Sequence, residues 1–362
     1  MNKYKVCVYG ICKNEEKFVK RWYESMKEAD AIFVLDTGST DNTVKLLKEF
    51  GVNVRTSKIE PWRFDVARNK SLDLIPDDYD ICVCTDLDEV FEKGWRKYLE
   101  DSWVGSTSRA RYNYNWSLDD NNRPLVNFYT DKIHQRKNYK WTHPVHEVLT
   151  FLGDKENIIT IDNIVLNHYS DKSKSRGSYL PLLELSVKED PNDDRNMHYL
   201  GREYMYYGKW NECIDTLIKH LNLKSSTWKD ERCASMRFIA RSYKNLGRVE
   251  ESKMWYDKAI NEAPYLRDSY VERGILEYEL DNYKEASKYL NDALNINSHE
   301  KTYINEIFSW DNTIYDMLSI CMFYLNRIDE SLFYIDKAID MEPNNERLIN
   351  NKKIIKIVFD IS

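Results

Sequence analysis

The chain has no long apolar run and no Cys-x-x-Cys pair. The longest apolar stretch near its start, from Val6 to Cys12, contains a glycine and leads into charged residues. We therefore expect no signal peptide, no transmembrane segment and a cytoplasmic location. The seven cysteines are an odd number, and Cys82 and Cys84 alternate along an apolar run, which favours reduced core thiols over disulfides or a thiolate zinc site.

An excess of positive charge and the common nucleotide-binding fingerprints are also missing. With 53 basic and 60 acidic residues the net charge is −7, which provides no field to hold a polyanion, so we expect no nucleic-acid partner. Neither Gly-x-Gly-x-x-Gly nor Gly-x-x-x-x-Gly-Lys-[Ser/Thr] occurs. The usual dinucleotide-binding turn and the P-loop are therefore excluded.

The chain does contain enough residues for two folded domains. Its 362 residues are more than a single hydrophobic core usually stabilises. With 42% hydrophobic and 31% charged residues, its composition is that of a globular protein. The residue patterns divide it into an α/β domain over 1–178, all-α helical repeats over 179–346 and a closing helix over 347–362.

Short apolar runs alternate with helix-like segments over about the first hundred residues, a pattern that predicts a parallel sheet. Beyond Arg109 the apolar period falls to two on either side of a polar turn, which predicts a hairpin over 109–130. The expected strands are 5–12, 31–36, 52–59, 79–85 and 158–168, and the expected helices are 15–26, 42–50 and 64–74.

The second half of the chain contains an internal repeat. Its anchor positions are Cys213, Ser252, Ala286 and Ser331, each followed four residues later by Leu217, Tyr256, Leu290 and Ile335. The anchors are 39, 34 and 45 residues apart, and 34 is the tetratricopeptide period, so the excesses predict insertions between units. This half resembles a tetratricopeptide array of about four helical pairs closed by a last helix. A plain helical bundle is the alternative.

Two acids, Asp86 and Asp88, follow an apolar strand. In an extended chain, side chains two positions apart point the same way. Both carboxylates are therefore expected on one side at the carboxyl end of the strand, where open α/β sheets bind ligands. Carboxylate oxygens suit Mg²⁺ or Mn²⁺ shared with phosphate oxygens. The alternative is a solvated acidic strand end.

A polar run from Asp36 to Thr43 follows the second expected strand. Gly38 allows the backbone to come close to a ligand. The helix that follows needs only Thr40 or Asp41 as its cap. Asp36 is therefore expected to be left over, and able to accept hydrogen bonds from a ribose or a base.

Four ordered motifs resemble those of the family 2 glycosyltransferases of the GT-A fold. They are Cys-Lys-Asn-Glu-Glu at 12–16, Val-Leu-Asp-Thr-Gly-Ser-Thr-Asp-Asn-Thr at 34–43, Ala-Arg-Asn at 67–69 and Thr-Asp-Leu-Asp-Glu at 85–89. The resemblance covers about residues 1–170 and implies an α/β GT-A nucleotide-sugar-binding domain. Joined to the repeats, it is similar to bacterial and phage transferases, among them enzymes that attach sugars to peptides.

The resemblance implies a donor site at the matched positions. Asp36 would contact the nucleoside, with Arg68 and Asn69 beside it. Glu16 belongs to the same donor-binding set. The donor is expected to be a nucleoside diphosphate sugar, UDP-linked.

The resemblance also implies a metal site. Asp86 and Asp88 would hold the donor through Mn²⁺ or Mg²⁺, with Asp88 the more direct ligand. His168 ends the last expected strand of this domain and is a further candidate ligand, since some GT-A enzymes complete the site with a late histidine. An imidazole ligand favours Mn²⁺. The alternative for His168 is a surface position without a ligand.

Transfer with inversion, which the family implies, requires a base near the acceptor. The segment Trp-Thr-His-Pro-Val-His-Glu at 141–147 offers Glu147 as the first candidate and His146 as the second. The alternative is that Glu147 only pairs with a neighbouring cation. Trp62, Trp116 and Trp141 are expected near the same edge, either as flat faces for a sugar ring or as core residues.

These patterns predict a metal-dependent glycosyltransferase that moves a hexose to an acceptor. A peptide or protein side chain is the favoured acceptor, because repeat modules of this kind bind polypeptide, and a growing glycan is the alternative. A homo-oligomer formed through the repeats is a further expected partner. One rival is a non-catalytic scaffold with a degenerate nucleotide domain. A nucleotidyltransferase is disfavoured, because no glycine-rich triphosphate loop lies near Gly10.

Overall fold

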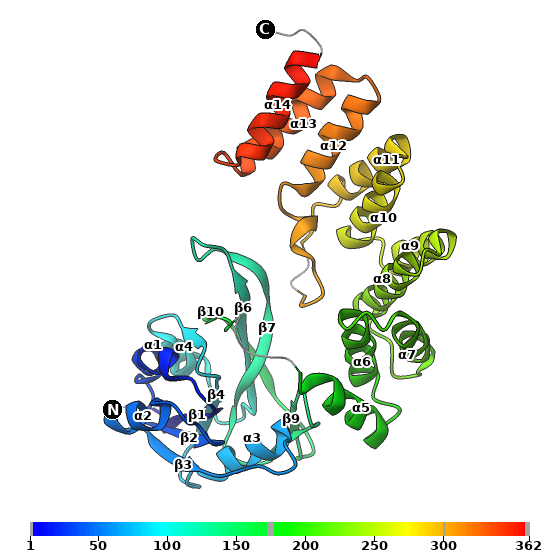
Figure 1. Cartoon of the computed structure of the whole chain (residues 1–362). Helices are drawn as coiled ribbons and strands as arrows, with labels where there is room; N and C mark the ends of the chain where they lie inside the picture. The colour runs from blue at the N-terminus through cyan, green and yellow to red at the C-terminus, as the bar shows by residue number, and fades with distance from the viewer. Residues whose placement is uncertain (1–2, 172–176, 300–301, 359–362) are drawn as a thin grey trace. The chain divides into compact units, whose positions relative to one another are not determined.

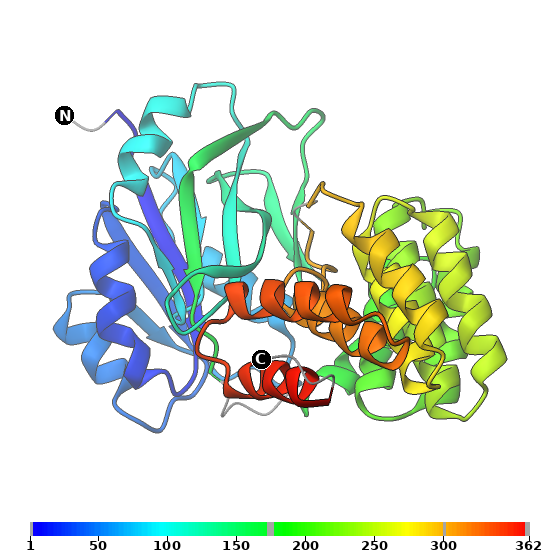
Figure 2. The ribbon, with the colours of Figure 1, turned by 90° about the horizontal axis from the view of Figure 1, so that it is seen from above.

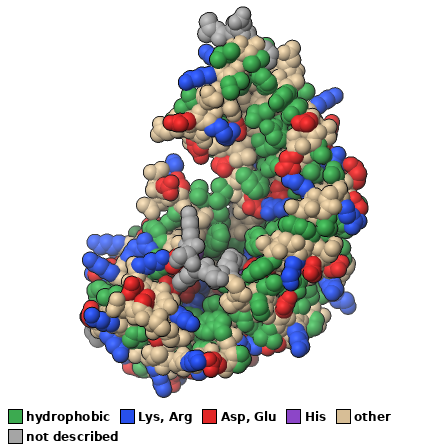
Figure 3. Space-filling view, viewed as in Figure 1, with side chains coloured by type: hydrophobic (Ala, Val, Ile, Leu, Met, Phe, Trp, Pro, Cys, Tyr) green, Lys and Arg blue, Asp and Glu red, His purple; other side chains and the backbone are tan. Residues whose placement is uncertain are grey.

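The computed structural model of the chain describes residues 3–171, 177–299 and 302–358. It divides into two compact units, with the main boundary between Glu189 and Asp190. The first unit is built on a mixed sheet and the second is helical (Figure 1). On the face shown in Figure 3, basic and acidic side chains are interspersed.

The first unit contains an eight-stranded sheet in the order β3-β2-β1-β4-β7-β6-β10-β5. Strands β1 to β4 are parallel, and β6 with β7 forms the expected hairpin. A separate two-stranded sheet joins β8 and β9. The strands are β1 Val6–Cys12, β2 Ala31–Asp36, β3 Asn53–Thr56, β4 Ile81–Cys84, β5 Glu89–Phe91, β6 Arg109–Leu118, β7 Pro124–Gln135, β8 Tyr139–Thr142, β9 Val148–Phe151 and β10 Ile158–His168.

The central strand β1 is buried on both faces, which explains its nearly continuous apolar run. Val6 and Val8 face a core cluster that includes Trp22, whereas Cys7 and Tyr9 face a second cluster. Helices α1, α2 and α4 supply the first cluster, and α3 with the β8–β9 sheet supplies the second. The helices of this unit are α1 Glu16–Met26, α2 Thr43–Glu49, α3 Phe64–Leu72, α4 Trp95–Ser102 and α5 Tyr179–Glu189. All seven cysteines of the chain are buried and unbridged.

In the second unit, successive helical pairs are followed by a last helix (Figures 1 and 2). The described residues of this unit form four such pairs. The pairs are α6 Asp194–Tyr206 with α7 Trp210–Asn222, α8 Lys229–Asn245 with α9 Val249–Glu262, α10 Arg267–Glu279 with α11 Tyr283–Leu294, and α12 Thr313–Tyr324 with α13 Ile328–Met341. The last helix, α14 Glu346–Val358, packs Leu348 against Ile335 and Ala338 of α13. None of the helices in the described ranges combines the length and apolarity that a bilayer span needs.

The repeat anchors are the packing positions of the second helix in each pair. Cys213, Ser252, Ala286 and Ser331 have no exposed surface, and the residues four positions later are at most 3% exposed. The longest insertion lies between α11 and α12 and includes the short 3₁₀ helix Ile307–Ser309.

Close helix packing explains two glycines of the repeats, Gly201 and Gly274. A Cβ atom on Gly201 of α6 would lie 2.3 Å from Leu217 Cδ2 of α7. A Cβ atom on Gly274 of α10 would lie 2.9 Å from Leu290 Cγ of α11. In both pairs the glycine therefore makes room for the leucine that follows the repeat anchor.

Filling this space should destabilise the helical unit. We expect Gly201→Val to lower the free energy of unfolding by about 1–3 kcal/mol, because the buried Leu217 side chain must move to accommodate it. Urea unfolding followed by far-ultraviolet circular dichroism measures this change. Asp215→Ala, at an exposed position of α7, is the control and should change stability by less than about 0.5 kcal/mol. Equal stabilities of the two variants would contradict the packing account.

Candidate active site

The acidic motif lies on a turn just past β4. The strand ends at Cys84, and the amide of Glu89 donates to the Asp86 carbonyl at 3.1 Å. Because the chain turns here, the motif is not extended like the strand before it. The prediction that the Asp86 and Asp88 side chains point to the same side rested on an extended chain, and that premise is wrong here. Leu87 is buried at the centre of the turn, and Asp86 and Asp88 contact different partners.

Asp86 lies between two cations. Its Oδ1 accepts from Arg68 Nη2 at 2.6 Å, and its Oδ2 is 3.8 Å from Lys132 Nζ. Burial raises the pKa of Asp86, but the charges of Arg68 and Lys132 outweigh burial and hold that pKa below its usual range. Asp86 is therefore a charged partner for both cations.

Asp88 pairs instead with His168, the last residue of β10. Asp88 Oδ2 lies 3.5 Å from His168 Nε2, and His168 Nδ1 lies 2.9 Å from the Trp116 carbonyl oxygen. A carbonyl oxygen only accepts, so Nδ1 carries hydrogen and Nε2 faces the carboxylate. Burial lowers the pKa of His168, but the hydrogen bond and charge of Asp88, the Trp116 carbonyl and the charge of Glu89 together outweigh burial and raise it. The structure thus brings together these two sequence-predicted residues.

Lys132 and Glu89 complete the surroundings of the motif. Glu89 is 1% exposed, accepts from the Tyr114 hydroxyl at 2.9 Å, and lies 3.4 Å from Lys132 Nζ. Burial raises the pKa of Glu89. Sequence reasoning missed Lys132 because the hairpin was expected to end at 130, whereas β7 continues to Gln135. Its alternation with Thr130 and His134 along that strand was the available signal.

Arg68 connects the acidic motif to Glu147, the first candidate for the base. Its Nε donates to Glu147 Oε1 at 2.9 Å while its Nη2 holds Asp86. The Arg68 side chain is 5% exposed. Glu147 therefore has the cation neighbour that was the alternative to a base role, and that cation also holds Asp86 of the acidic motif.

Glu147 follows a loop with two left-handed histidines. His143 has φ 74° and His146 has φ 50°. The His146 ring lies 5.6 Å from the Tyr179 ring in an edge arrangement. The Phe64 amide of α3 donates to the Pro144 carbonyl at 2.9 Å, which ties this loop to the helix that carries Arg68.

Trp141 is a core residue and not a sugar-stacking face. It is 2% exposed, and its indole Nε1 donates to the Tyr9 hydroxyl at 3.0 Å. The Tyr9 hydroxyl lies 2.8 Å from His134 Nε2, and His134 Nδ1 lies 2.7 Å from the Gln135 carbonyl oxygen. Trp116 is 49% exposed beside His168, at a ring distance of 6.5 Å, so this tryptophan keeps an available face.

Asn69, the neighbour of Arg68 on α3, holds the β8 backbone. Its amide nitrogen donates to the Trp141 carbonyl at 2.8 Å, and its amide oxygen accepts from the Trp141 N–H at 2.9 Å. Both polar ends of the side chain are thus engaged within the fold. Its expected place beside a nucleoside stays a prediction.

The sequence predicted that Asp36 would have no part in the turn that follows β2. The structure shows that it does take part in this turn. Its carboxylate accepts from the Gly38 amide at 3.3 Å and the Ser39 amide at 3.0 Å, and the residue is 1% exposed. The expectation failed because a buried carboxylate takes the nearest backbone donors. Its contact with a nucleoside stays a prediction.

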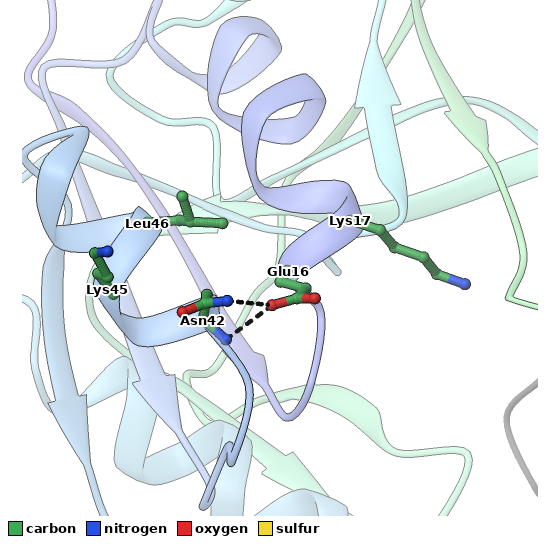
Figure 4. Close-up of a pocket in the computed structure, with 5 residues that line it drawn as sticks. All are labelled: Glu16, Lys17, Asn42, Lys45 and Leu46. Atoms are coloured by element: carbon green, nitrogen blue, oxygen red, sulfur yellow. Dashed lines mark hydrogen bonds between the residues drawn. The ribbon is translucent and has the colours of Figure 1, made fainter.

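Glu16 closes the start of α2. Its Oε2 accepts from the Asn42 amide at 2.9 Å and from Asn42 Nδ2 at 3.0 Å (Figure 4). It lines a pocket of about 430 Å³ whose wall contains none of the residues around the acidic motif. The lining residues are Glu16, Lys17, Asn42, Lys45 and Leu46.

The sequence-predicted metal ligands do not all converge. Within the described ranges, three ligand atoms of acidic, histidine or cysteine side chains come within 4.8 Å of one another only at Asp194, His220 and Glu231. In the first unit, Asp88 and His168 face each other, and Asp86 lies with Arg68 and Lys132.

Comparison with known proteins identifies the type of each unit. Residues 7–152 match the family model described as Glycosyl transferase family 2. The first unit is a family 2 glycosyltransferase domain. Residues 238–265 and 268–300 match the tetratricopeptide repeat model, so the glycosyltransferase domain is joined to tetratricopeptide repeats. The predicted fold class, a GT-A-type α/β domain followed by all-α repeats, is confirmed.

Individual relatives are distant. The SPbeta prophage-derived glycosyltransferase SunS of Bacillus subtilis (strain 168) is 27% identical over 230 residues, which is 59% of this chain and 52% of SunS. The chain thus spans about half the length of that relative. The lipopolysaccharide core biosynthesis glycosyltransferase LpsC of Rhizobium meliloti (strain 1021) is 32% identical over 99 residues, 26% of this chain and 36% of LpsC. The solved structure of MamA is 17% identical over 49% of this chain and 99% of its own, with a TM-score of 0.39.

The buried His134 makes the stability of the glycosyltransferase domain depend on pH. Burial lowers the pKa of His134 to about 3, so between pH 6.5 and 3 the unfolded chain binds a proton that the folded chain does not. Stability should therefore fall as the pH falls. From pH 7.5 to 5.5 the contribution of His134 is a loss of about 1.4 kcal/mol.

Urea unfolding of the wild type and of His134→Gln at both pH values measures this contribution. The variant should lose less stability than the wild type over the same interval. Equal losses would show that His134 is not held neutral in the folded chain.

Proposed function

We propose that the chain is a metal-dependent, inverting glycosyltransferase that moves a hexose from a UDP-linked sugar to a peptide or protein side chain. The observation that supports it most is the Arg68 bridge. One buried guanidinium links Asp86 of the acidic motif to Glu147, the first candidate for the base. Donor-side and acceptor-side groups of a transferase thereby lie in one hydrogen-bonded group.

The residues around the acidic motif fit a divalent cation. Asp88 offers a carboxylate oxygen and His168 an imidazole nitrogen, a donor pair that suits Mn²⁺. The Trp116 carbonyl fixes the ring so that Nε2 faces Asp88, as an outer partner does in metal sites. A bound cation would neutralise charge on the departing diphosphate. Asp86, held by Arg68 and Lys132, would keep the motif turn in place.

Glu147 would take a proton from an acceptor. Arg68 holds Oε1, and no described residue hydrogen-bonds Oε2. Oε2 would accept the proton of an acceptor hydroxyl or thiol as the acceptor oxygen or sulfur bonds to the anomeric carbon and the bond from that carbon to the diphosphate oxygen breaks. His146 remains the second candidate, and its ring lies against Tyr179.

The acceptor has two candidate classes. The tetratricopeptide repeats favour a peptide, because stacked repeats form extended binding surfaces. The name of LpsC, a lipopolysaccharide core biosynthesis glycosyltransferase, favours a glycan. Assays of a peptide panel and a glycan panel with the same UDP-sugars separate the two classes, and transfer to glycans alone would contradict the peptide acceptor.

The metal assignment predicts a severe loss of turnover in Asp88→Asn. Replacing the carboxylate should lower the rates of Mn²⁺-dependent hydrolysis and transfer of the UDP-sugar by about 10²-fold or more. The reason is that the cation that would neutralise the departing diphosphate loses a ligand. Asp120→Asn, at an exposed position of the hairpin turn, is the matched control and should retain full turnover. Both variants should keep the wild-type helical signal. Wild-type turnover in Asp88→Asn would contradict the assignment.

A further inference from the structure

Arg68 holds two carboxylates with different nitrogens of one planar group. Nη2 donates to Asp86 Oδ1 at 2.6 Å, and Nε donates to Glu147 Oε1 at 2.9 Å. The third nitrogen, Nη1, lies 3.6 Å from Cys84 Sγ. The two carboxylates therefore cannot shift independently while the guanidinium stays in place.

The guanidinium itself is fixed by the fold. Its carbon lies 5.6 Å from the centre of the Trp141 ring, and the Arg68 side chain is 5% exposed. Trp141 is held by Tyr9 through its indole and by Asn69 through its backbone. Since Asn69 follows Arg68 on α3, one turn of helix positions both the cation and the ring beneath it.

The two carboxylates differ in how much they depend on Arg68. Asp86 also has Lys132 at 3.8 Å, and its backbone is fixed by the turn to Glu89. For Glu147, Arg68 is the one described hydrogen-bond partner of the carboxylate. Loss of the Arg68 fork should therefore leave Asp86 in place and release Glu147.

We propose that Arg68 is a positioning residue that aligns the Glu147 carboxylate with the donor side of the site. The inference rests on the proposed function and adds a specific dependence to it. Because Arg68 binds both carboxylates, it holds Glu147 at a fixed position relative to Asp86. Glu147 would then take the acceptor proton at a fixed position relative to the donor. A misplacement of about 1 Å costs on the order of 10²-fold in rate, which makes such a constraint measurable.

Arg68→Lys tests this role. A lysine ammonium is a point charge and cannot reproduce the planar arrangement in which two nitrogens hold two carboxylates. We expect kcat for transfer to fall by about 10²-fold, while calorimetric affinity for UDP with Mn²⁺ changes by less than about threefold because Lys132 still holds Asp86. Arg63→Lys, at the start of the same helix with Asp65 and Glu189 as partners, is the control and should keep the wild-type kcat.

The decisive comparison repeats Arg68→Lys in a Glu147→Gln background. If Arg68 acts through Glu147, the substitution should cost less than about threefold there, because the aligned group is already gone. Equal costs in both backgrounds would overturn the role of Arg68 and leave the proposed function standing. A wild-type chain that transfers no sugar would contradict the proposed function itself.

Glu147→Asp keeps the inference testable if Arg68→Lys does not fold. The shorter aspartate side chain moves the carboxylate away from Arg68 Nε, while Arg68 still donates its hydrogen bond to Asp86. We expect the same pattern, a kcat lowered by about 10²-fold with donor affinity unchanged. Circular dichroism and thermal unfolding establish that the variant is folded. An unchanged kcat in the folded Glu147→Asp variant would overturn the inference.

Discussion

The candidate active site of the glycosyltransferase domain is arranged around one constraint, the buried guanidinium of Arg68 with its two carboxylate partners. A charge removed from water is stable only if it is paired, and Arg68 finds its partners in a turn and in a loop that are 61 residues apart in the chain, at Asp86 and Glu147. Helix α3 supplies the cation, and the turn after β4 and the loop after β8 supply the acids. The pairing joins three segments that are distant in the sequence.

The sequence predicted the limits of three strands well. β2 and β10 have the predicted limits, and β1 differs by one residue; β1 and β2 are nearly continuous buried runs, which is the local signal that marked them. β7 was predicted less well. It extends to Gln135, which pairs with Ile81 of β4, so a long-range partner determines its length. That extension is what brings Lys132 beside the acidic motif.

The candidate site was predictable in its members and not in their contacts. The motif resemblance marked Asp86, Asp88 and Arg68, and the late histidine His168 does face Asp88. The sequence could not show that the motif turns away from the strand. Nor could it show that the fold uses the carboxylate of Asp36, whose partners depend on backbone geometry. In the repeats, by contrast, small anchor residues with an apolar residue four positions later identified the packing positions, because neighbouring pairs use the same contact.

A crystal structure of the full chain with Mn²⁺ and UDP tests the central claim most directly. The account predicts the ion bonded to Asp88 and His168, the diphosphate on that ion, and Arg68 still between Asp86 and Glu147. An ion or a diphosphate bound away from Asp88 and His168, or a Glu147 carboxylate turned out of the site, would contradict it.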